Sequence, residues 1–358
     1  MTFNSVFVVP AWFSLWLISR LDDLPAQIFN IFHTNHRDCT RESHQELFAR
    51  AFISVAEFAT CNSSITIDGI IRELITEGVL PPQAQAENLN NARYFIFIIL
   101  GFQTALYCPS PLDSNGRAPH LLFITEDHGC CRYTHPLLAQ DINVCAHEPL
   151  SEFLMGFGVL LPSKNLCLAE EPDILRAFQQ QVEIEPKTFN AYALHSLAGL
   201  KFKWTDALSC HLEFNPTTKE ISLFRFPTFC HSCLEKINHF LLEIILSYRL
   251  LFGQTRKSRS LFRSRSWLAI PADLRQVWSL SQKETYYLPE DFPILRYRIV
   301  ILRNCLSATV PRTLAQLWRD RRDSANWMTF WAVMIFGIFG SITAFMQVVL
   351  QFAQLLIA

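Results

Sequence analysis

The chain has 358 residues, of which 50% are hydrophobic and 18% charged, and its formal net charge is -1. This composition excludes an intrinsically disordered chain, which would hold fewer apolar residues. The near-neutral balance argues against nucleic acid as a partner, because nucleic-acid binders carry a basic excess. Eleven cysteines are also too few for a disulfide scaffold of this length. A globular protein, a membrane protein, or a combination of the two remains.

Residues 1–110 are predicted to be mostly helical. In Glu46–Phe58 the apolar residues recur at helical spacing, and Thr66 lies in a typical N-cap region before a second helix. The apolar run Tyr94–Tyr107 indicates a buried core element. A helix, a capped second helix and a strand-like run would suit a winged helix, although the second helix lacks the basic face that such a module needs, with Arg72 its one arginine.

The N-terminal apolar stretch Val6–Ile18 allows two interpretations. It has 13 residues and contains Pro10, so it is too short to cross a bilayer. It also lacks the basic start and the small-residue cleavage site of a signal peptide. We therefore keep both a signal and a core element open for residues 6–18.

Residues 111–323 are predicted to form a mixed α+β region. Leu121–Thr125 and Leu200–Trp204 have the composition of short strands. His211–Phe226 reads as a β-hairpin around a polar turn. Leu234–Phe252 places its apolar residues at helical spacing and is the longest helix expected before the tail. The fold class is thus α+β, with a helical N-terminal part, a mixed middle that contains a β-hairpin, and one C-terminal transmembrane helix.

A basic loop is predicted at residues 254–266, which hold five basic residues and no acidic one. The basic residues are Arg256, Lys257, Arg259, Arg263 and Arg265. The loop could simply be solvated, or it could lie on anionic lipid at the cytosolic face of a membrane. A third interpretation is regulation, since phosphate on the interspersed serines would cancel the positive field.

Cysteine and histidine residues offer weak metal-ligand candidates. Cys230 and Cys233 form a C-x-x-C motif, which serves either redox chemistry or zinc binding. Further ligands would have to come from the His/Cys-rich loop 128–147, for instance His128 and Cys130. Their one-residue separation departs from the usual ligand spacing. Reduced thiols and loop histidines therefore remain the plain interpretation, and no cofactor is predicted.

Motifs for catalysis are missing from the sequence. It contains no G-x-S-x-G elbow and no glycine-rich phosphate loop. His195 beside Ser196, and Asp206 near His211, are isolated pairs of a kind more typical of a core. No catalytic residue is predicted. An enzyme held at a membrane, with its site near loop 128–147, stays open as an alternative.

The last 35 residues form the clearest feature of the chain. Ser324–Ala358 contains no Asp, Glu, Lys, Arg or His. Its central 20 residues, Trp327–Met346, would span about 30 Å as a helix, which is the thickness of a hydrocarbon core. Residues 324–358 are therefore predicted to be a single transmembrane tail anchor, inserted after synthesis ends. The representative positions of the span are Trp327, Trp331, Phe336, Gly337, Ser341 and Met346.

The charges that flank the tail predict its orientation. Four arginines precede the span and no Lys or Arg follows it; they are Arg312, Arg319, Arg321 and Arg322. Positive charge stays on the cytosolic side of a membrane. The N-terminal part is thus predicted to be cytosolic, with the endoplasmic reticulum the favoured membrane.

The tail also carries residues that favour contact between helices. Gly337 and Ser341 form a small-xxx-small pair, and Gln347, Gln351 and Gln354 share one helix face. Small residues let two helices approach closely, and amides bond across them. Self-association through the tail is one interpretation. The other is that the glutamines lie at the far headgroup level.

Two segments resemble a family of filamentous-fungal proteins. They are Leu317–Trp331, LWRDRRDSANWMTFW, and the block from Trp204 to Cys230. The members of that family are similar over most of the chain and end in one hydrophobic tail. The resemblance implies a fungal membrane-associated protein, and it assigns no activity, cofactor or catalytic residue.

The sequence as a whole predicts a single-pass membrane protein whose cytosolic domain serves interaction or scaffolding. Its expected partners are the lipid bilayer, a second copy through the tail helix, and cytosolic proteins of unknown identity. The alternatives are a membrane-tethered enzyme near loop 128–147 and a winged-helix-like regulator held at a membrane.

Overall fold

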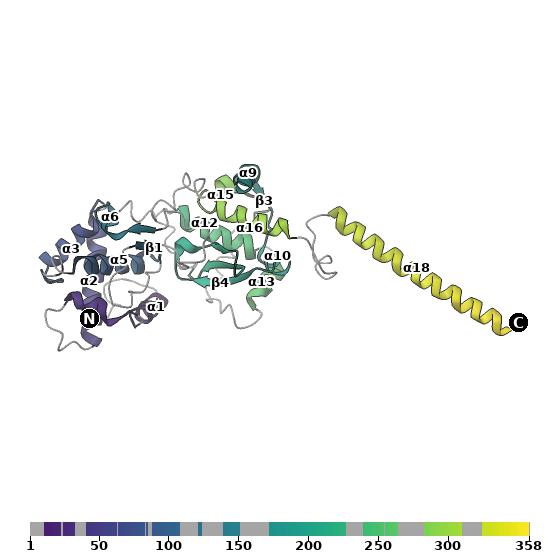
Figure 1. Cartoon of the computed structure of the whole chain (residues 1–358), viewed down its shortest axis with the longest axis horizontal. Coiled ribbons are helices and arrows are strands. Elements are labelled where there is room, and N and C mark those ends of the chain that lie inside the picture. Colours follow the sequence, from purple (N-terminus) through teal and green to yellow (C-terminus); the bar gives the residue numbers. More distant parts are fainter. Residues whose placement is uncertain are drawn as a thin grey trace.

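The computed structural model places the chain in two lobes and one long separate helix (Figure 1). It describes residues 11–22, 24–32, 41–62, 64–82, 84, 88–107, 121–123, 139–150, 172–226, 239–253, 255–263, 283–309 and 324–357. Each lobe surrounds its own cluster of buried apolar side chains, and α18 (Ser324–Ile357) stands clear of both. Helices, small sheets and this apolar helix confirm the predicted α+β class in outline.

The first lobe is mostly helical. Its elements are α1 (Ala11–Asp22), η2 (Ala26–Phe32), α2 (Arg41–Cys61), α3 (Ile67–Thr76), α5 (Leu89–Thr104), β1 (Leu121–Phe123), β2 (Ala139–Asp141) and α6 (Ile142–Cys145). The predicted cap before α3 is present, because Thr66 Oγ1 accepts a hydrogen bond of 3.0 Å from the Gly69 backbone N–H. Strands β1 and β2 pair antiparallel.

Helix α5 forms the centre of this lobe. Every residue from Ala92 to Phe102 is buried. After the helix ends, Tyr107 folds back so that its ring stacks on Phe97 at 4.2 Å and its hydroxyl donates to the Phe97 carbonyl. A Cβ on Gly101 would lie only 2.7 Å from Tyr107 Cε2. Glycine at 101 is therefore what lets the tyrosine pack against the helix.

The apolar run Tyr94–Tyr107 is helical over most of its length. Residues 94–104 belong to α5, which satisfies its backbone hydrogen bonds internally while its side chains are buried on all sides. As predicted, the run is a core element. Its arginine, Arg93, is buried, so neither α3 nor α5 presents the basic face of a DNA reader.

The second lobe combines helices with short strands. Its elements are α9 (Pro172–Gln180), β3 (Glu183–Ile184), α10 (Ala191–Ser196), β4 (Lys201–Thr205), η6 (Leu208–Cys210), β5 (Phe214–Asn215), β6 (Glu220–Phe224), α12 (His239–Tyr248), η8 (Arg249–Gly253), α13 (Arg256–Arg263), β7 (Tyr286–Tyr287), α15 (Leu288–Asp291) and α16 (Arg296–Ala308). Strands β3 and β7 form a separate antiparallel pair.

The predicted hairpin is confirmed as the pair β5–β6, with Phe214 opposite Ile221. Its first strand is shorter than expected. Leu212 has φ +61°, so the chain turns there before β5 begins, at a conformation that extended strands do not use. Strand β4 adds to the far side of β6 in parallel, which gives the order β4-β6-β5.

Two other predicted segments differ in detail. The helix expected over 234–252 begins, within the described residues, at His239 and passes into the π-helix η8. Most of the predicted basic loop is helix α13. The Thr255 hydroxyl accepts a hydrogen bond from the Ser258 backbone N–H, which caps the helix start. Because this segment is mostly polar, it lacks the apolar spacing that would have predicted a helix.

The two lobes meet through both backbone and side chains. The N–H groups of Leu208 and Ser209 donate to the carbonyls of Ala105 and Leu106. Beside this contact the buried carboxylate of Asp206 accepts from the Trp16 indole at 3.1 Å and pairs with Arg20. Arg225, from the second lobe itself, lies 3.5 Å from the same carboxylate. The junction of α1 with the β4–η6 connection is thus polar at its centre.

Candidate functional site

Helix α18 is the strongest candidate for a functional element. Within it, Met328–Gln354 comprises 27 residues that are long and apolar enough to cross a membrane, and none of them is buried against the rest of the chain. Phe336 and Met346, for example, are 76% and 53% exposed. A core helix of a soluble protein would be covered. The segment also lies after both lobes, where a signal sequence would not be found.

The predicted span residues lie in this helix as expected. Trp331, Phe336, Gly337, Ser341 and Met346 fall within Met328–Gln354, and Trp327 lies one residue before it in α18. At 1.5 Å per residue the segment is about 40 Å long, so it covers a hydrocarbon core with room for tilt.

The few hydroxyl groups in the middle of α18 are satisfied by the helix itself. Ser341 Oγ donates to the Gly337 carbonyl at 2.9 Å, and Thr343 donates to the Phe339 carbonyl. Such bonds to the preceding turn reduce the cost of placing a hydroxyl in lipid. A Cβ on Gly337 or Gly340 would meet nothing within 4 Å. The face of α18 that carries these glycines is therefore not covered by other parts of the described chain.

The remaining predicted positions near the span are outside the described residues. Arg312, Arg319, Arg321 and Arg322 are among them. The orientation of α18 in a membrane consequently rests on the sequence alone.

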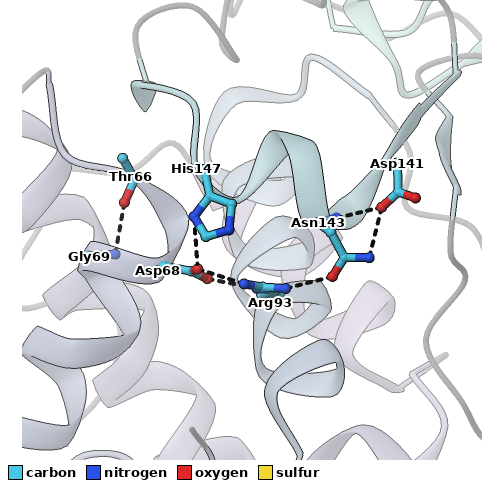
Figure 2. A network of polar contacts seen from close by, with 7 residues as sticks. All are labelled: Thr66, Asp68, Gly69, Arg93, Asp141, Asn143 and His147. Carbon is cyan, nitrogen blue, oxygen red and sulfur yellow. Dashed lines mark hydrogen bonds and ion pairs between the residues drawn. The ribbon is translucent and has the colours of Figure 1, made fainter.

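A buried arginine organises a polar cluster in the first lobe (Figure 2). Arg93, from α5, donates through Nε and Nη2 to the two carboxylate oxygens of Asp68 at 2.7 and 2.6 Å. Its Nη1 donates to Asn143 Oδ1, also at 2.7 Å. The Asn143 amide in turn donates to Asp141 Oδ1. The exposed ring of His147 lies 3.3 Å from the Asp68 carboxylate.

This cluster joins three elements rather than forming a reaction centre. Asp68 begins α3, Arg93 lies on α5, and Asn143 belongs to α6. The guanidinium forms a bidentate pair with Asp68, which is a strong and geometrically specific interaction. Because Arg93 donates hydrogen bonds to both α3 and α6, its role is to hold α6 against α3 and α5.

A histidine and a serine meet in the core of the second lobe without forming a catalytic pair. His211 Nδ1 accepts from the Phe224 backbone N–H at 3.1 Å. Its Nε2 therefore carries the proton and donates to Ser247 Oγ at 2.6 Å. Ser247 Oγ donates onward to the Ile244 carbonyl. A general base must accept the serine proton, and this imidazole has no free nitrogen with which to do so.

Burial keeps His211 neutral. Burial, together with the smaller effect of the nearby Arg298 guanidinium, lowers the pKa of His211 to about 3. Arg298 also donates to the His211 carbonyl. The other isolated pairs in the sequence are likewise structural, since His195 Nδ1 contacts the Leu200 carbonyl and Ser196 donates to the Tyr192 carbonyl.

One buried carboxylate was not singled out by sequence reasoning. Glu243 is 2% exposed on the apolar helix α12. It accepts hydrogen bonds from the backbone N–H groups of Ile294 and Leu295 at the start of α16. Burial raises the pKa of Glu243 to about 7, although these hydrogen bonds oppose the shift. In the sequence Glu243 appears as a single acid inside an apolar helix, and this pattern does not identify its hydrogen-bond partners.

The metal candidates of the sequence, His128, Cys130, Cys230 and Cys233, lie outside the described residues. Within those residues no three His, Cys, Asp or Glu side chains form a group that could hold a metal ion. Cys145 lies in the first core, where burial raises the pKa of its thiol to about 12. His147 is exposed beside Asp68 instead.

The basic segment forms a helix at the surface, and its side chains differ in exposure and in hydrogen bonding. Arg256 and Lys257 are exposed on α13, whereas Arg259 donates to the Gly253 carbonyl at the end of η8. Ser258 is fully buried and donates to Asn190 Oδ1. Arg263 is the last residue of α13, and Arg265 lies outside the described residues.

No protein-family model, curated protein or solved structure matches this chain.

Proposed function

We propose that this chain is a single-pass membrane protein, anchored by α18, whose two lobes form a cytosolic interaction or scaffolding module. The observation that carries the proposal is the exposure of Met328–Gln354. This segment is apolar along 27 residues, and none of it is buried in the fold. In water such a surface would associate with any apolar phase, and a bilayer matches its length.

The cytosolic placement of the lobes rests on charge. Four arginines lie between residues 312 and 322, directly before α18. Basic residues next to a span favour retention of their side in the cytosol. We further propose the endoplasmic reticulum of a filamentous fungus as the setting, in line with the resemblance of Leu317–Trp331 to fungal proteins.

An interaction role is supported by how the described polar groups are used. Arg93, His211 and Glu243 each use hydrogen bonds to join elements of the fold. Catalytic groups, in contrast, face a substrate and need a free proton site or a free lone pair. Within the described residues these buried groups therefore serve rigidity.

The membrane anchor is tested by fractionation of cells that express the tagged full chain or a chain without residues 324–358. We expect the full chain in the membrane pellet after alkaline carbonate extraction and the truncated chain in the supernatant. A full chain that is extracted by carbonate would contradict the anchor.

Orientation is tested by an acceptor that the chain already carries. Asn62-Ser63-Ser64 is an N-glycosylation sequon, and Asn62 is exposed, with its Oδ1 accepting from Ser64 Oγ at 2.8 Å. We expect no glycosidase-sensitive mass shift at Asn62. A sequon appended after residue 358 should be modified and serves as the positive control. A shift that Asn62→Gln abolishes would reverse the topology.

A further inference from the structure

Helix α13 presents a basic face at the surface of the second lobe. Arg256 and Lys257 are exposed at its first turn, and Ser260 is exposed one turn later. The helix lies at the surface of the second lobe, near α10 (Figure 1). No acidic residue occurs in the whole segment 254–266. Its charge is therefore not balanced by its own neighbours in sequence.

The opposite side of α13 fixes the helix to the lobe. The Ser258 hydroxyl donates to Asn190 and accepts from the Tyr192 backbone N–H. Arg259 donates to the Gly253 carbonyl. These contacts fix the inner face of α13 to the lobe. Arg256 and Lys257 are consequently held on the outer side of the helix.

The exposed cations have no carboxylate partner within the described residues. The ion pairs there join other groups, such as Lys283 with Asp291. Lys257 Nζ lies 5.1 Å above the Tyr192 ring, a contact that positions the charge and leaves it accessible to solvent. Unpaired cations that are held outward on a rigid helix are well suited to bind phosphate groups.

We propose that the exposed face of α13, formed by Arg256, Lys257 and Ser260, binds the anionic phospholipid headgroups of the bilayer that α18 crosses. This proposal rests on the proposed membrane function. Lipid is favoured over nucleic acid because the chain is neutral overall and brings its own membrane anchor. The lobe therefore faces a membrane surface at high effective concentration.

The length of the connection permits this contact. Residues 310–323 separate the end of the second lobe from α18, and 14 residues span at most about 50 Å when extended. A lobe of this size has a diameter of roughly 40 Å. Even its far side is consequently within reach of the bilayer.

The test uses the full chain in lipid nanodiscs and measures backbone hydrogen exchange over residues 255–263 and over α18. One set of discs contains phosphatidylcholine alone, and the other also contains phosphatidylserine. Each basic residue near an anionic surface strengthens contact about five-fold, so the two residues together should slow exchange in α13 by up to about 25-fold in the anionic discs. The Arg256→Glu/Lys257→Glu variant should lose this protection, and Ser260→Glu should weaken it.

The matched control is Arg50→Glu/Arg72→Glu, which changes the net charge equally at exposed positions of the first lobe. It should keep the protection of α13. Equal exchange of α13 in both discs, an equal loss in the control, or protection by an RNA oligonucleotide in place of anionic lipid would overturn the proposal. Protection of α18 in both discs reports insertion separately, so failure of the membrane function would be recognised on its own.

Discussion

Helices α5 and α18 are both strongly apolar, yet they occupy opposite environments. Helix α5 is covered on all sides by the first lobe, whereas no residue of Met328–Gln354 in α18 is buried. Two properties separate them. Helix α5 has 16 residues and includes Arg93, whose charge is paired with Asp68, while α18 has 34 residues and no charged side chain. Apolar composition therefore favours burial, and length and charge distinguish a helix covered by protein from one that could be covered by lipid.

We expect the largest effect from placing charge in the middle of α18, which should prevent its insertion into a membrane. Ile338→Arg/Ile342→Arg adds two charges at the centre of the span, each costing about 2.5 to 3.5 kcal/mol of insertion free energy. We expect the variant to appear in the soluble fraction after carbonate extraction. Gln354→Arg, at the end of the span, is the control and should stay in the membrane. A double variant that remains membrane-bound would contradict the assignment of α18.

In α5 the decisive change is removal of its charge. Arg93→Met leaves Asp68 without its partner in a mostly buried site, which typically costs about 3 to 5 kcal/mol. We expect the free energy of unfolding of the first lobe to fall by that amount in denaturant titrations of the full chain. Arg72→Met removes an exposed arginine from α3 and should change stability by less than about 0.5 kcal/mol. Equal effects of the two substitutions would refute the joining role of Arg93.

Helix α12 extends the comparison, because it is an apolar helix that buries an acid, Glu243, which has no basic partner in contact among the described residues. The pKa of Glu243 is about 7 in the folded chain and near 4.5 unfolded. Between these values the folded state binds more protons, so stability falls as pH rises from 4.5 to 7. The effect of this group amounts to about 3 kcal/mol.

The measurement is the free energy of unfolding of wild type and Glu243→Gln at pH 5 and pH 8. The variant should gain relative to wild type at pH 8, by an amount that shrinks towards pH 5. The substitution Glu290→Gln, at an exposed position, serves as the control. His211 acts in the opposite sense, since its pKa of about 3 makes stability fall as pH drops from 6.5. Taking the difference between the free energies of unfolding of wild type and Glu243→Gln removes the contribution of His211, which both chains share.

The smallest expected effect compares glycines in the two apolar helices. Gly101→Ala places a Cβ 2.7 Å from Tyr107 Cε2, and overpacking of this kind costs about 1 to 3 kcal/mol. Gly340→Ala meets open space in α18 and should leave the unfolding of the lobes unchanged. Thermal unfolding in detergent measures both. A stabilised Gly101→Ala chain would show that Tyr107 is free to move away.

Sequence reasoning succeeded where structure depends on a few neighbouring residues. The Thr66 cap, the turn between β5 and β6, and the apolar run of α18 are each local patterns, and each is present in the structure. It was wrong about the loop at 254–266, where the cap at Thr255 begins a helix. The orientation of the span and the self-association of its small-residue face remain predictions.

What the sequence determined is the presence of a membrane-length helix, because length, apolar composition and lack of charge are properties of one continuous segment. Only the tertiary structure decided how the buried polar groups are matched. Asp206 meets Trp16 and Arg20 from the other lobe, and His211 meets Ser247, 36 residues away. The same holds for β4, which lies parallel to β6. These pairings follow from the packing of distant elements, since a buried donor or acceptor is stabilised by whichever partner the fold brings within reach.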